Sequence, residues 1–195
     1  MRLFSLTLGV VFCAIGCAPP ASTPETTPAT TPSAASPAPS RNAPPSVPMA
    51  HAAAVIHDLA GAHVGDVTFA DTYAGLLVAG TLRGVGLGAH AIHIHEFGKC
   101  VAPFTTAGGH FNPEHHQHGF KNPEGPHLGD LPNIDTPAAG VLEFEFVMPG
   151  VTLHGKNALL DADGASFVVH SSHDDYTTDP SGNSGGRIAC GVITG

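Results

Sequence analysis

Histidines concentrated in one Gly/Pro-rich stretch limit, more than any other feature, what this chain can fold into. Eight of its fourteen histidines lie between His90 and Asp130, in HAIHIHEFGKCVAPFTTAGGHFNPEHHQHGFKNPEGPHLGD. Glycine and proline interrupt most of this stretch too often for a long helix or a central strand. Imidazoles gathered on a loop are typical metal ligands. The sequence therefore predicts a metal-binding loop, with the rest of the chain as its scaffold.

The composition excludes several classes of partner and fold. Seven Lys and Arg stand against sixteen Asp and Glu, for a formal net charge of −9. Such a chain is a poor candidate for binding nucleic acid or an anionic membrane surface. There are 24 glycines, 18 prolines and no tryptophan, and long helix-period stretches are missing. This pattern favours short strands joined by turns.

The first 17 residues predict a secretory signal. Arg2 supplies the positive end, and the apolar core that follows is too short to span a bilayer as a mature helix. The end of this segment, AIGC, resembles a bacterial lipobox, in which cleavage precedes the cysteine and Cys17 is then acylated. Ala14 stands where leucine is usual. Ordinary signal cleavage after Ala18 or Ala21 is the alternative.

Residues 18–48 consist almost entirely of Ala, Pro, Ser and Thr. A segment with so little to bury is expected to be disordered, with polyproline character, and to act as a tether or as a neutral spacer. The folded domain is expected at 49–195. Cys100 and Cys190 are its two cysteines, far apart in sequence, and they predict one disulfide formed in an oxidising compartment.

The folded domain is predicted to be all-β. The connection after His95, of over forty residues, is far longer than a structureless loop should be unless it is functional. Ser171 to Gly186 is a second long loop. We expect an eight-stranded antiparallel Greek-key β-barrel, an immunoglobulin-like sandwich, with two long functional loops. The eight predicted strands are Ala53 to Leu59, Val64 to Ala70, Tyr73 to Leu82, His90 to His95, Val141 to Met148, Val151 to His154, Ala165 to His170 and Arg187 to Thr194.

The histidines divide into two candidate metal sites. His93 and His95 alternate on a strand, so both imidazoles point to the same face. His170 is a further candidate for this site, and His110 a possible fourth; four nitrogen ligands suit Cu(II). The second set adds one carboxylate to three imidazoles, which suits tetrahedral structural zinc. Its members are His110, His118, His127 and Asp130.

Five segments together resemble the copper/zinc superoxide dismutase family. They are HIHEFG, GGHFNP, HLGDLPNI, VVH and GGRIACGVI, and the resemblance extends from about Ala53 to Thr194. It implies copper held by His93, His95, His110 and His170, and zinc held by His110, His118, His127 and Asp130. His110 would then bridge both metals as an imidazolate. The implied activity is dismutation of superoxide to oxygen and hydrogen peroxide by Cu(II)/Cu(I) cycling.

The same resemblance implies roles for four other residues. Arg187 matches a guanidinium beside the copper that orients the superoxide anion. Asp174 matches a carboxylate that links a copper histidine to a zinc histidine. Cys100 and Cys190 match the family disulfide. From Met49 onward five Lys and Arg face fifteen Asp and Glu, so a local positive funnel must attract the anion, with Lys99 or Lys121 as further candidates.

These features predict an exported enzyme of the bacterial cell envelope, lipid-anchored through Cys17, which protects the envelope from extracytoplasmic superoxide. A monomer and a homodimer are both compatible with the sequence. The alternative function is a non-catalytic copper/zinc-binding envelope protein on the same fold. A metal hydrolase is a third hypothesis, but the chain lacks the strand–helix repeat typical of such enzymes. The remaining histidines are expected to be a structural His90 and exposed His51, His57, His63, His115, His116, His154 and His173.

Overall fold

The computed structural model describes residues 49–195. The expected signal segment with Cys17 and the expected linker at 18–48 lie outside the described residues. Within the described part of the chain, no helix has the length and apolar character needed to cross a membrane.

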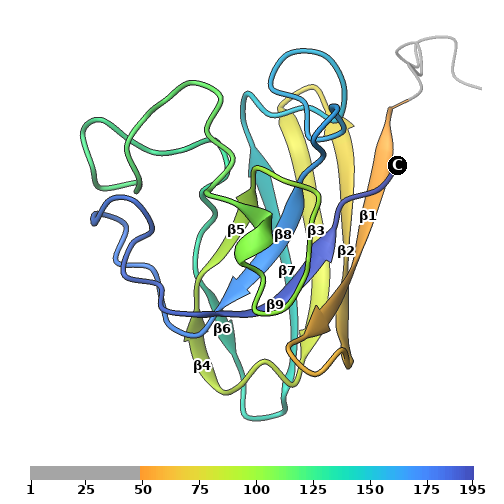
Figure 1. Ribbon diagram of the computed structural model, residues 1–195, viewed down its shortest axis with the longest axis vertical. Coiled ribbons are helices and arrows are strands. Elements are labelled where there is room, and N and C mark those ends of the chain that lie inside the picture. The colour runs from red at the N-terminus through yellow and green to blue at the C-terminus, as the bar shows by residue number, and fades with distance from the viewer. Residues whose placement is uncertain (1–48) are drawn as a thin grey trace, which may run out of the picture. The chain divides into compact units, whose positions relative to one another are not determined.

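Between residues 49 and 195, nine strands and one short 3₁₀ helix make up the fold (Figure 1). Seven strands form one antiparallel sheet in the order β5-β8-β9-β1-β2-β3-β7, and β4 pairs with β6. Because β6 also contacts β7, and β4 leads directly into β5, the sheet curls towards closure. The all-β prediction is confirmed. The elements are β1 (His51–Asp58), β2 (His63–Thr72), β3 (Gly75–Arg83), β4 (Gly88–His90), β5 (Ile92–His95), η1 (Thr105–Ala107), β6 (Ile134–Thr136), β7 (Val141–Met148), β8 (Ser166–His170) and β9 (Arg187–Val192).

The core lies inside the curled sheet and follows the period of two in the strands. Along β1 every second residue is buried up to Ile56, and the residues between them are exposed. The alternation of β7 is weaker, with half-buried residues facing inward until Met148. Large side chains that are fully buried include Ile56, Phe69 and Phe167. This interior gives β5 and β8 a rigid base for the side chains on their outer faces.

Two sequence-based boundaries were wrong for reasons of hydrogen bonding. The predicted strand from His90 to His95 is two strands, because the Ala91 N–H donates to Ser172 O and its carbonyl accepts from the His170 N–H. Val151 to His154 is not a strand. Thr152 forms only an isolated bridge to Ala158, and its hydroxyl donates to backbone carbonyls within the following turn. The short β6 lies inside the predicted long connection and was missed.

The first long connection, residues 96–133, folds back over the outer face of β5. The Ile94 N–H donates to Gly129 O at 2.9 Å, and the Phe111 N–H donates to Ile94 O at 2.8 Å. Isolated bridges pair His93 with Asp130 and His95 with His110. The loop therefore covers β5, and backbone hydrogen bonds to the edge of this strand hold it in place.

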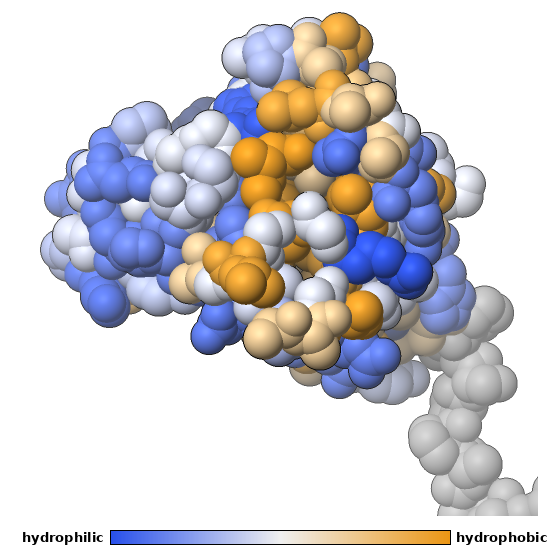
Figure 2. Space-filling model, turned by 90° about the horizontal axis from the view of Figure 1, so that it is seen from below, coloured by the Kyte–Doolittle hydropathy of each residue, from blue (hydrophilic) through white to orange (hydrophobic). Residues whose placement is uncertain are grey.

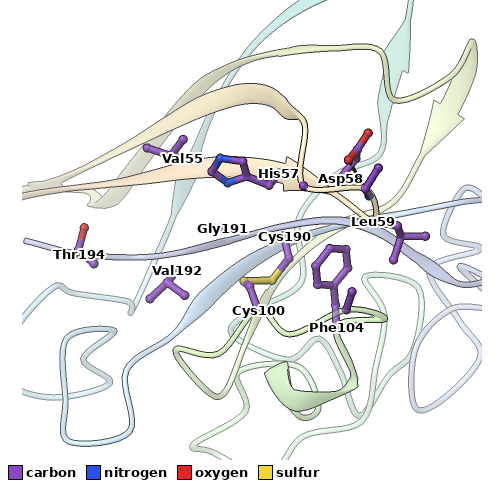
Figure 3. A pocket seen from close by; sticks show the side chains of 13 residues that line it. Val55, His57, Asp58, Leu59, Cys100, Phe104, Cys190, Gly191, Val192 and Thr194 are labelled. Carbon is purple, nitrogen blue, oxygen red and sulfur yellow. Dashed lines mark hydrogen bonds between the residues drawn. A yellow bond between two sulfur atoms is a disulfide. The ribbon is translucent and has the colours of Figure 1, made fainter.

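The predicted disulfide is confirmed. Cys100 of the long connection is bonded to Cys190 of β9, with 5.7 Å between their Cα atoms. Phe104, Ala107 and Val168 pack around it as a small second core. Figure 3 shows the bond at the wall of a surface pocket that Val55 and His57 of β1 also line. The bond fixes one end of the long connection to the barrel.

Apolar side chains gather at the end of the barrel that carries the β1–β2 and β6–β7 turns (Figures 1 and 2). Exposed large hydrophobic residues in these turns and in the β3–β4 turn include Leu59, Leu87 and Val141. This surface is distinct from the cavity that the histidines line.

Candidate metal centre

The histidines of β5 point away from the barrel interior, under the two long loops. All four residues of β5 are buried: Ile92 and Ile94 belong to the hydrophobic core, and His93 and His95 alternate with them. The first loop brings His110, His118, His127 and Asp130 onto this face, and the end of β8 brings His170. Segments far apart in the sequence therefore place six imidazoles and a carboxylate in one buried cluster.

Four ligand atoms converge on one point of this cluster. Asp130 Oδ1 lies 2.8 Å from His110 Nδ1, 3.1 Å from His118 Nδ1 and 3.3 Å from His127 Nδ1. The Nδ1 atoms of His127 and His110 are 3.4 Å apart. Ligand atoms bound to one zinc at about 2.0–2.1 Å in tetrahedral geometry lie about 3.3 Å from one another. This set has the separations that a zinc ion requires.

A second point lies on the other side of the His110 ring. His95 Nε2 and His170 Nε2 are 3.3 Å apart. His93 Nδ1 and His110 Nε2 are buried nitrogens without any hydrogen-bond partner. The four residues can each offer an atom within 4.8 Å of the others. Orphaned buried nitrogens are costly unless something binds them, and a cation held by four imidazoles satisfies them all.

One compact grouping takes His93 rather than His127 with His110, His118 and Asp130. The rings of His93 and His110 have centroids only 3.9 Å apart, which explains this overlap. His93 Nε2, however, bonds Asp174 Oδ2 at 3.0 Å. The free Nδ1 of His93 therefore faces the point where His95 and His170 meet. His127 Nδ1 faces Asp130, and we therefore place His127 in the carboxylate-containing set.

Hydrogen bonds on the far side of the rings fix which nitrogen is available as a ligand. His95 Nδ1 lies 3.0 Å from Gly108 O, which can only accept, so this nitrogen carries the proton and Nε2 is free. The Asp174 carboxylate does the same for His93. The Ser184 hydroxyl lies 3.1 Å from His170 Nδ1. The acceptor-only partners of His95 and His93 thus fix the tautomer of these two rings.

Burial sets the protonation state of the histidines at the second point, where all four donor atoms are imidazole nitrogens. It lowers the pKa of His110 to about 4 and that of His170 to about 2, and it lowers the pKa of His95 well below the usual value. Positive charge on neighbouring histidines and on Arg187 lowers the pKa values of His95 and His170 further. At neutral pH these rings are therefore neutral, which is the form that binds a metal.

Asp130 and His118 depart from their usual pKa values in the opposite sense, towards their charged forms. Burial opposes charge on both, but hydrogen bonds between the imidazoles and the carboxylates outweigh it. The pKa of Asp130 is held below its usual range, and that of His118 is raised to about 9.

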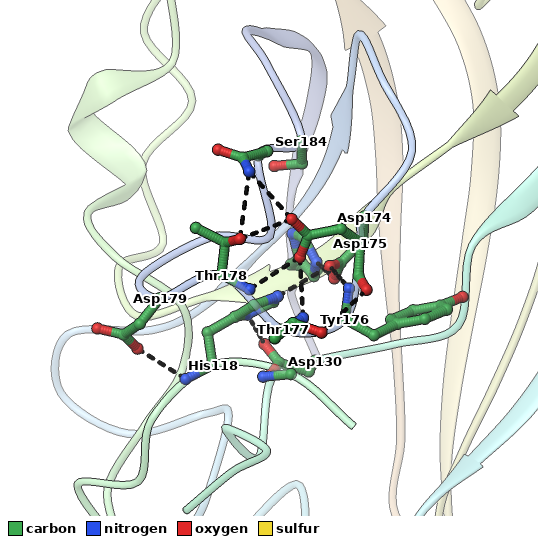
Figure 4. A network of polar contacts seen from close by, with 12 residues as sticks. His118, Asp130, Asp174, Asp175, Tyr176, Thr177, Thr178, Asp179 and Ser184 are labelled. Carbon is green, nitrogen blue, oxygen red and sulfur yellow. Dashed lines mark hydrogen bonds and ion pairs between the residues drawn. The ribbon is translucent and has the colours of Figure 1, made fainter. Parts of the chain in front are cut away.

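The second long loop, residues 171–186, closes over the cluster through Asp174 (Figure 4). Asp174 Oδ2 bonds His93 Nε2 at 3.0 Å and Oδ1 bonds His118 Nε2 at 2.9 Å, with both side chains fully buried. It therefore links one ring of each set. Gly182, at φ +64°, approaches so closely that a Cβ there would lie 1.8 Å from Asp174 Oδ1. The loop backbone needs glycine at this position.

Three loop residues without a role in the sequence analysis hold this arrangement. Asp175 accepts bonds from the N–H groups of Thr177 and Thr178, from the Thr178 hydroxyl and from the Asn183 amide. Asp179 Oδ1 accepts from the His118 N–H at 2.7 Å. Asn133 Oδ1 accepts from the Asp174 N–H, and its amide donates to Asp174 O. The sequence around Asp179 (Asp-Pro) and around Asn133 (Asn-Ile-Asp) contains no motif that would have predicted these contacts.

Arg187 lines a cavity of about 480 Å³ that opens onto the second point. Its guanidinium donates to Phe104 O at 2.6 Å and to Gly108 O at 2.5 Å. Burial lowers its pKa, but an arginine remains charged at neutral pH. The lining also includes His95, His110, His115, His170 and Glu96.

The lysines suggested as parts of a funnel do not line this cavity. Of the described residues that line it, Arg187 alone is a lysine or an arginine. Lys121 Nζ lies instead 5.3 Å from the centre of the Tyr176 ring, a cation–π distance. The exposed state expected for His115, His116 and His173 is observed, although His115 reaches the cavity mouth.

Comparison with known proteins agrees with this geometry. Residues 63–193 match the family described as copper/zinc superoxide dismutase (SODC). Superoxide dismutase [Cu-Zn] 2 of Aquifex aeolicus (strain VF5) is 46% identical over 137 residues, which cover 68% of this chain and 80% of that protein. Superoxide dismutase [Cu-Zn] of Caulobacter vibrioides is 44% identical over 147 residues, 73% of this chain and 84% of that protein.

A solved structure, that of a SOD-like protein from Bacillus subtilis, superposes with a TM-score of 0.70 at 39% identity. The match covers 74% of this chain and 98% of that one. Fold, donor set and sequence thus agree over most of the described residues, and the chain belongs to the copper/zinc superoxide dismutase family, a family of oxidoreductases that contain copper and zinc.

Proposed function

We propose that the chain dismutes superoxide at a copper–zinc pair bridged by His110, and that it does so outside the cytoplasm. One observation carries the proposal: buried ligand atoms converge on two points that share the His110 ring, with Nδ1 at one and Nε2 at the other. Bound copper would supply one-electron exchange, oxidising one superoxide to oxygen and reducing the next to hydrogen peroxide, while zinc would hold the bridge.

We assign the ligands by the separations of their atoms. His93 Nδ1 and the Nε2 atoms of His95, His110 and His170 would hold copper. The Nδ1 atoms of His110, His118 and His127 and Asp130 Oδ1 would hold zinc.

Arg187 binds the substrate anion in this proposal. Its two carbonyl partners hold the guanidinium at the cavity that His95, His110 and His170 line, so a small anion entering the cavity meets a fixed positive charge. His110 is the proton donor. Its Nε2 belongs to a ring that lines the same cavity, and when this nitrogen is not bound to copper it can hold a proton and pass it to the second superoxide as that anion is reduced, the other proton coming from water.

Export to the cell envelope is supported by the Cys100–Cys190 disulfide, because such bonds persist in oxidising compartments. It is also supported by the signal-like segment that ends at Cys17. We propose that Cys17 carries a lipid, that residues 18–48 tether the domain at 49–195 to a membrane, and that the enzyme protects the envelope from extracytoplasmic superoxide.

Metal content measured together with dismutation tests the proposal. We expect one copper and one zinc per chain, and activity that disappears when copper is chelated and returns when copper is restored. Zinc alone, with no dismutation after copper is supplied, would favour the non-catalytic metal-binding function. Labelling of intact cells with a radioactive fatty acid, compared between the native chain and Cys17→Ser, tests the lipid anchor.

A further inference from the structure

Two histidines and a carboxylate lie close together on the outer surface of the β1–β2 hairpin. His57 of β1 and His63 of β2 are directly opposite partners in the antiparallel ladder, and both are exposed. Their ring centroids are 6.0 Å apart in an edge-on arrangement. Directly opposite residues have Cβ atoms about 4.5–5.5 Å apart, so the two imidazoles can converge on one ion by rotating about their side-chain bonds.

A β-bulge adds a carboxylate to this pair. In a regular strand His63 and Asp66 would point to opposite faces, since side chains alternate. The ladder shifts between Ile56 and His57, where β2 has one residue more than β1. Val64 and Gly65 both turn inward as a result, and His63 and Asp66 both face solvent. Bulges commonly re-aim side chains in this way.

The spacing of the donor atoms is that of two ligands on one ion. His63 Nε2 and Asp66 Oδ2 lie 3.0 Å apart, with side chains 46% and 61% exposed. In the carboxylate-containing set of the buried centre, donor atoms of different residues lie 2.8–3.4 Å apart. Two imidazoles and a carboxylate, with solvent completing the shell, are a donor set that suits zinc or copper(II).

The backbone that carries these side chains is fixed on both sides. The turn after β1 is held by Asp58 Oδ1, which accepts from the N–H groups of Ala60 and Ala62, each at 2.8 Å. His57 also pairs with Cys190 of β9, which is the disulfide cysteine. Figure 3 shows the His57 ring on β1 beside Val55. An ion bound here would therefore order three side chains and no backbone.

We propose that His57, His63 and Asp66 bind one divalent transition-metal ion of the zinc and copper class, in addition to the metals of the buried centre. The excess of acidic over basic residues in the chain favours binding of a cation. The site is independent of the dismutation proposal, because it shares no residue with the buried centre.

Equilibrium dialysis of the full chain, already loaded with one copper and one zinc, against micromolar zinc chloride tests the site. We expect one additional zinc per chain. It should be lost in His57→Ala and in His63→Ala, and bound about 10–100-fold more weakly in Asp66→Asn. His154→Ala, which removes an exposed histidine elsewhere, is the matched control and should retain it.

Two results would overturn the proposal. One is a loaded native chain that takes up no additional zinc. The other is additional zinc retained in the His57→Ala variant, which would place the ion on other residues. The copper and zinc content of the buried centre, measured on every variant before dialysis, shows that each one is folded and loaded, because none of the three residues belongs to that cluster.

Discussion

His170 is the histidine whose loss separates the two metal positions of the buried centre. It comes from β8 rather than from the long connection, and its Nε2 faces His95 Nε2 on the side of His110 away from Asp130. Its Nδ1 is occupied by the Ser184 hydroxyl. Removal of this ring therefore takes a ligand from one metal and leaves the four donor atoms of the other in place.

We expect His170→Ala to lose dismutation while keeping one zinc per chain. Elemental analysis and a superoxide consumption assay on the same sample measure both quantities. His173→Ala removes an exposed histidine from the loop that directly follows β8 and is the control. Full activity in His170→Ala would contradict the copper assignment.

Arg187 contributes charge at the cavity and holds two carbonyl groups of the first loop. Arg187→Ala is expected to lower kcat/KM about tenfold or more, since local focusing of charge raises on-rates by about 10 to 10³. The salt dependence of the rate should become weaker, because the steering charge is gone. Both metals should remain bound.

Stopped-flow measurement at several ionic strengths checks the Arg187 prediction. Arg83→Ala, an exposed arginine at the end of β3, removes the same charge at a distance from the cavity lining. A salt dependence unchanged from the native enzyme would argue against steering by Arg187. Arg187→Lys should restore part of the rate, because the charge returns without the two-carbonyl fork.

At the scale of the elements, the Cys100–Cys190 bond determines how firmly the first loop is attached. It closes a segment of 90 residues, for which chain entropy predicts a contribution of roughly 4 kcal/mol to the free energy of unfolding. The loop it pins includes Gly108, whose carbonyl accepts bonds from both His95 and Arg187. Loss of the bond should therefore affect the site as well as stability.

Urea unfolding of Cys100→Ser/Cys190→Ser tests this contribution. We expect the free energy of unfolding to fall by roughly 4 kcal/mol, and kcat to fall in the metal-loaded variant because Arg187 and His95 lose a fixed partner. The native chain treated with a thiol-alkylating reagent without reduction is the control. A double variant with unchanged stability would contradict the loop-closure argument.

The elements also show what the sequence could predict. Period-two alternation of apolar and charged residues was sufficient to predict the long β7, because burial on one face imposes it. It failed for the three-residue β6 and for the break at Ala91, because both depend on hydrogen bonds to loops. Residue type and spacing were sufficient to propose His93, His95 and Asp130. They could not reveal Asp175, Asp179 or Asn133, whose roles depend on backbone groups that the fold brings near.

At the scale of the whole molecule, the metal-free domain should be most stable near the ordinary histidine pKa of 6.5. His110 and His170 have pKa values lowered to about 4 and about 2, so the unfolded chain takes up their protons first as pH falls below 6.5. Their contribution to stability is thus lost on acidification. His118, with its pKa raised to about 9, contributes stability below 6.5 that is lost as pH rises through 9.

Thermal unfolding of the metal-free protein from about pH 4 to 9 measures this balance. The melting temperature should be highest near pH 6.5 and should decline on both sides. In His118→Asn the decline on the alkaline side should disappear while the decline on the acidic side remains. A melting temperature that rises steadily to pH 9 in the native chain would contradict the pKa assigned to His118.

The Asp174 carboxylate has one further consequence, which concerns equilibrium rather than catalysis. It holds one ring from each metal position, and the His110 ring belongs to both. Occupying either position orders groups that the other also needs, so the two binding equilibria share a free energy of interaction. Thermodynamic reciprocity then requires zinc to raise copper affinity by the same factor as copper raises zinc affinity. We therefore expect metal uptake by this domain to be cooperative within a single chain.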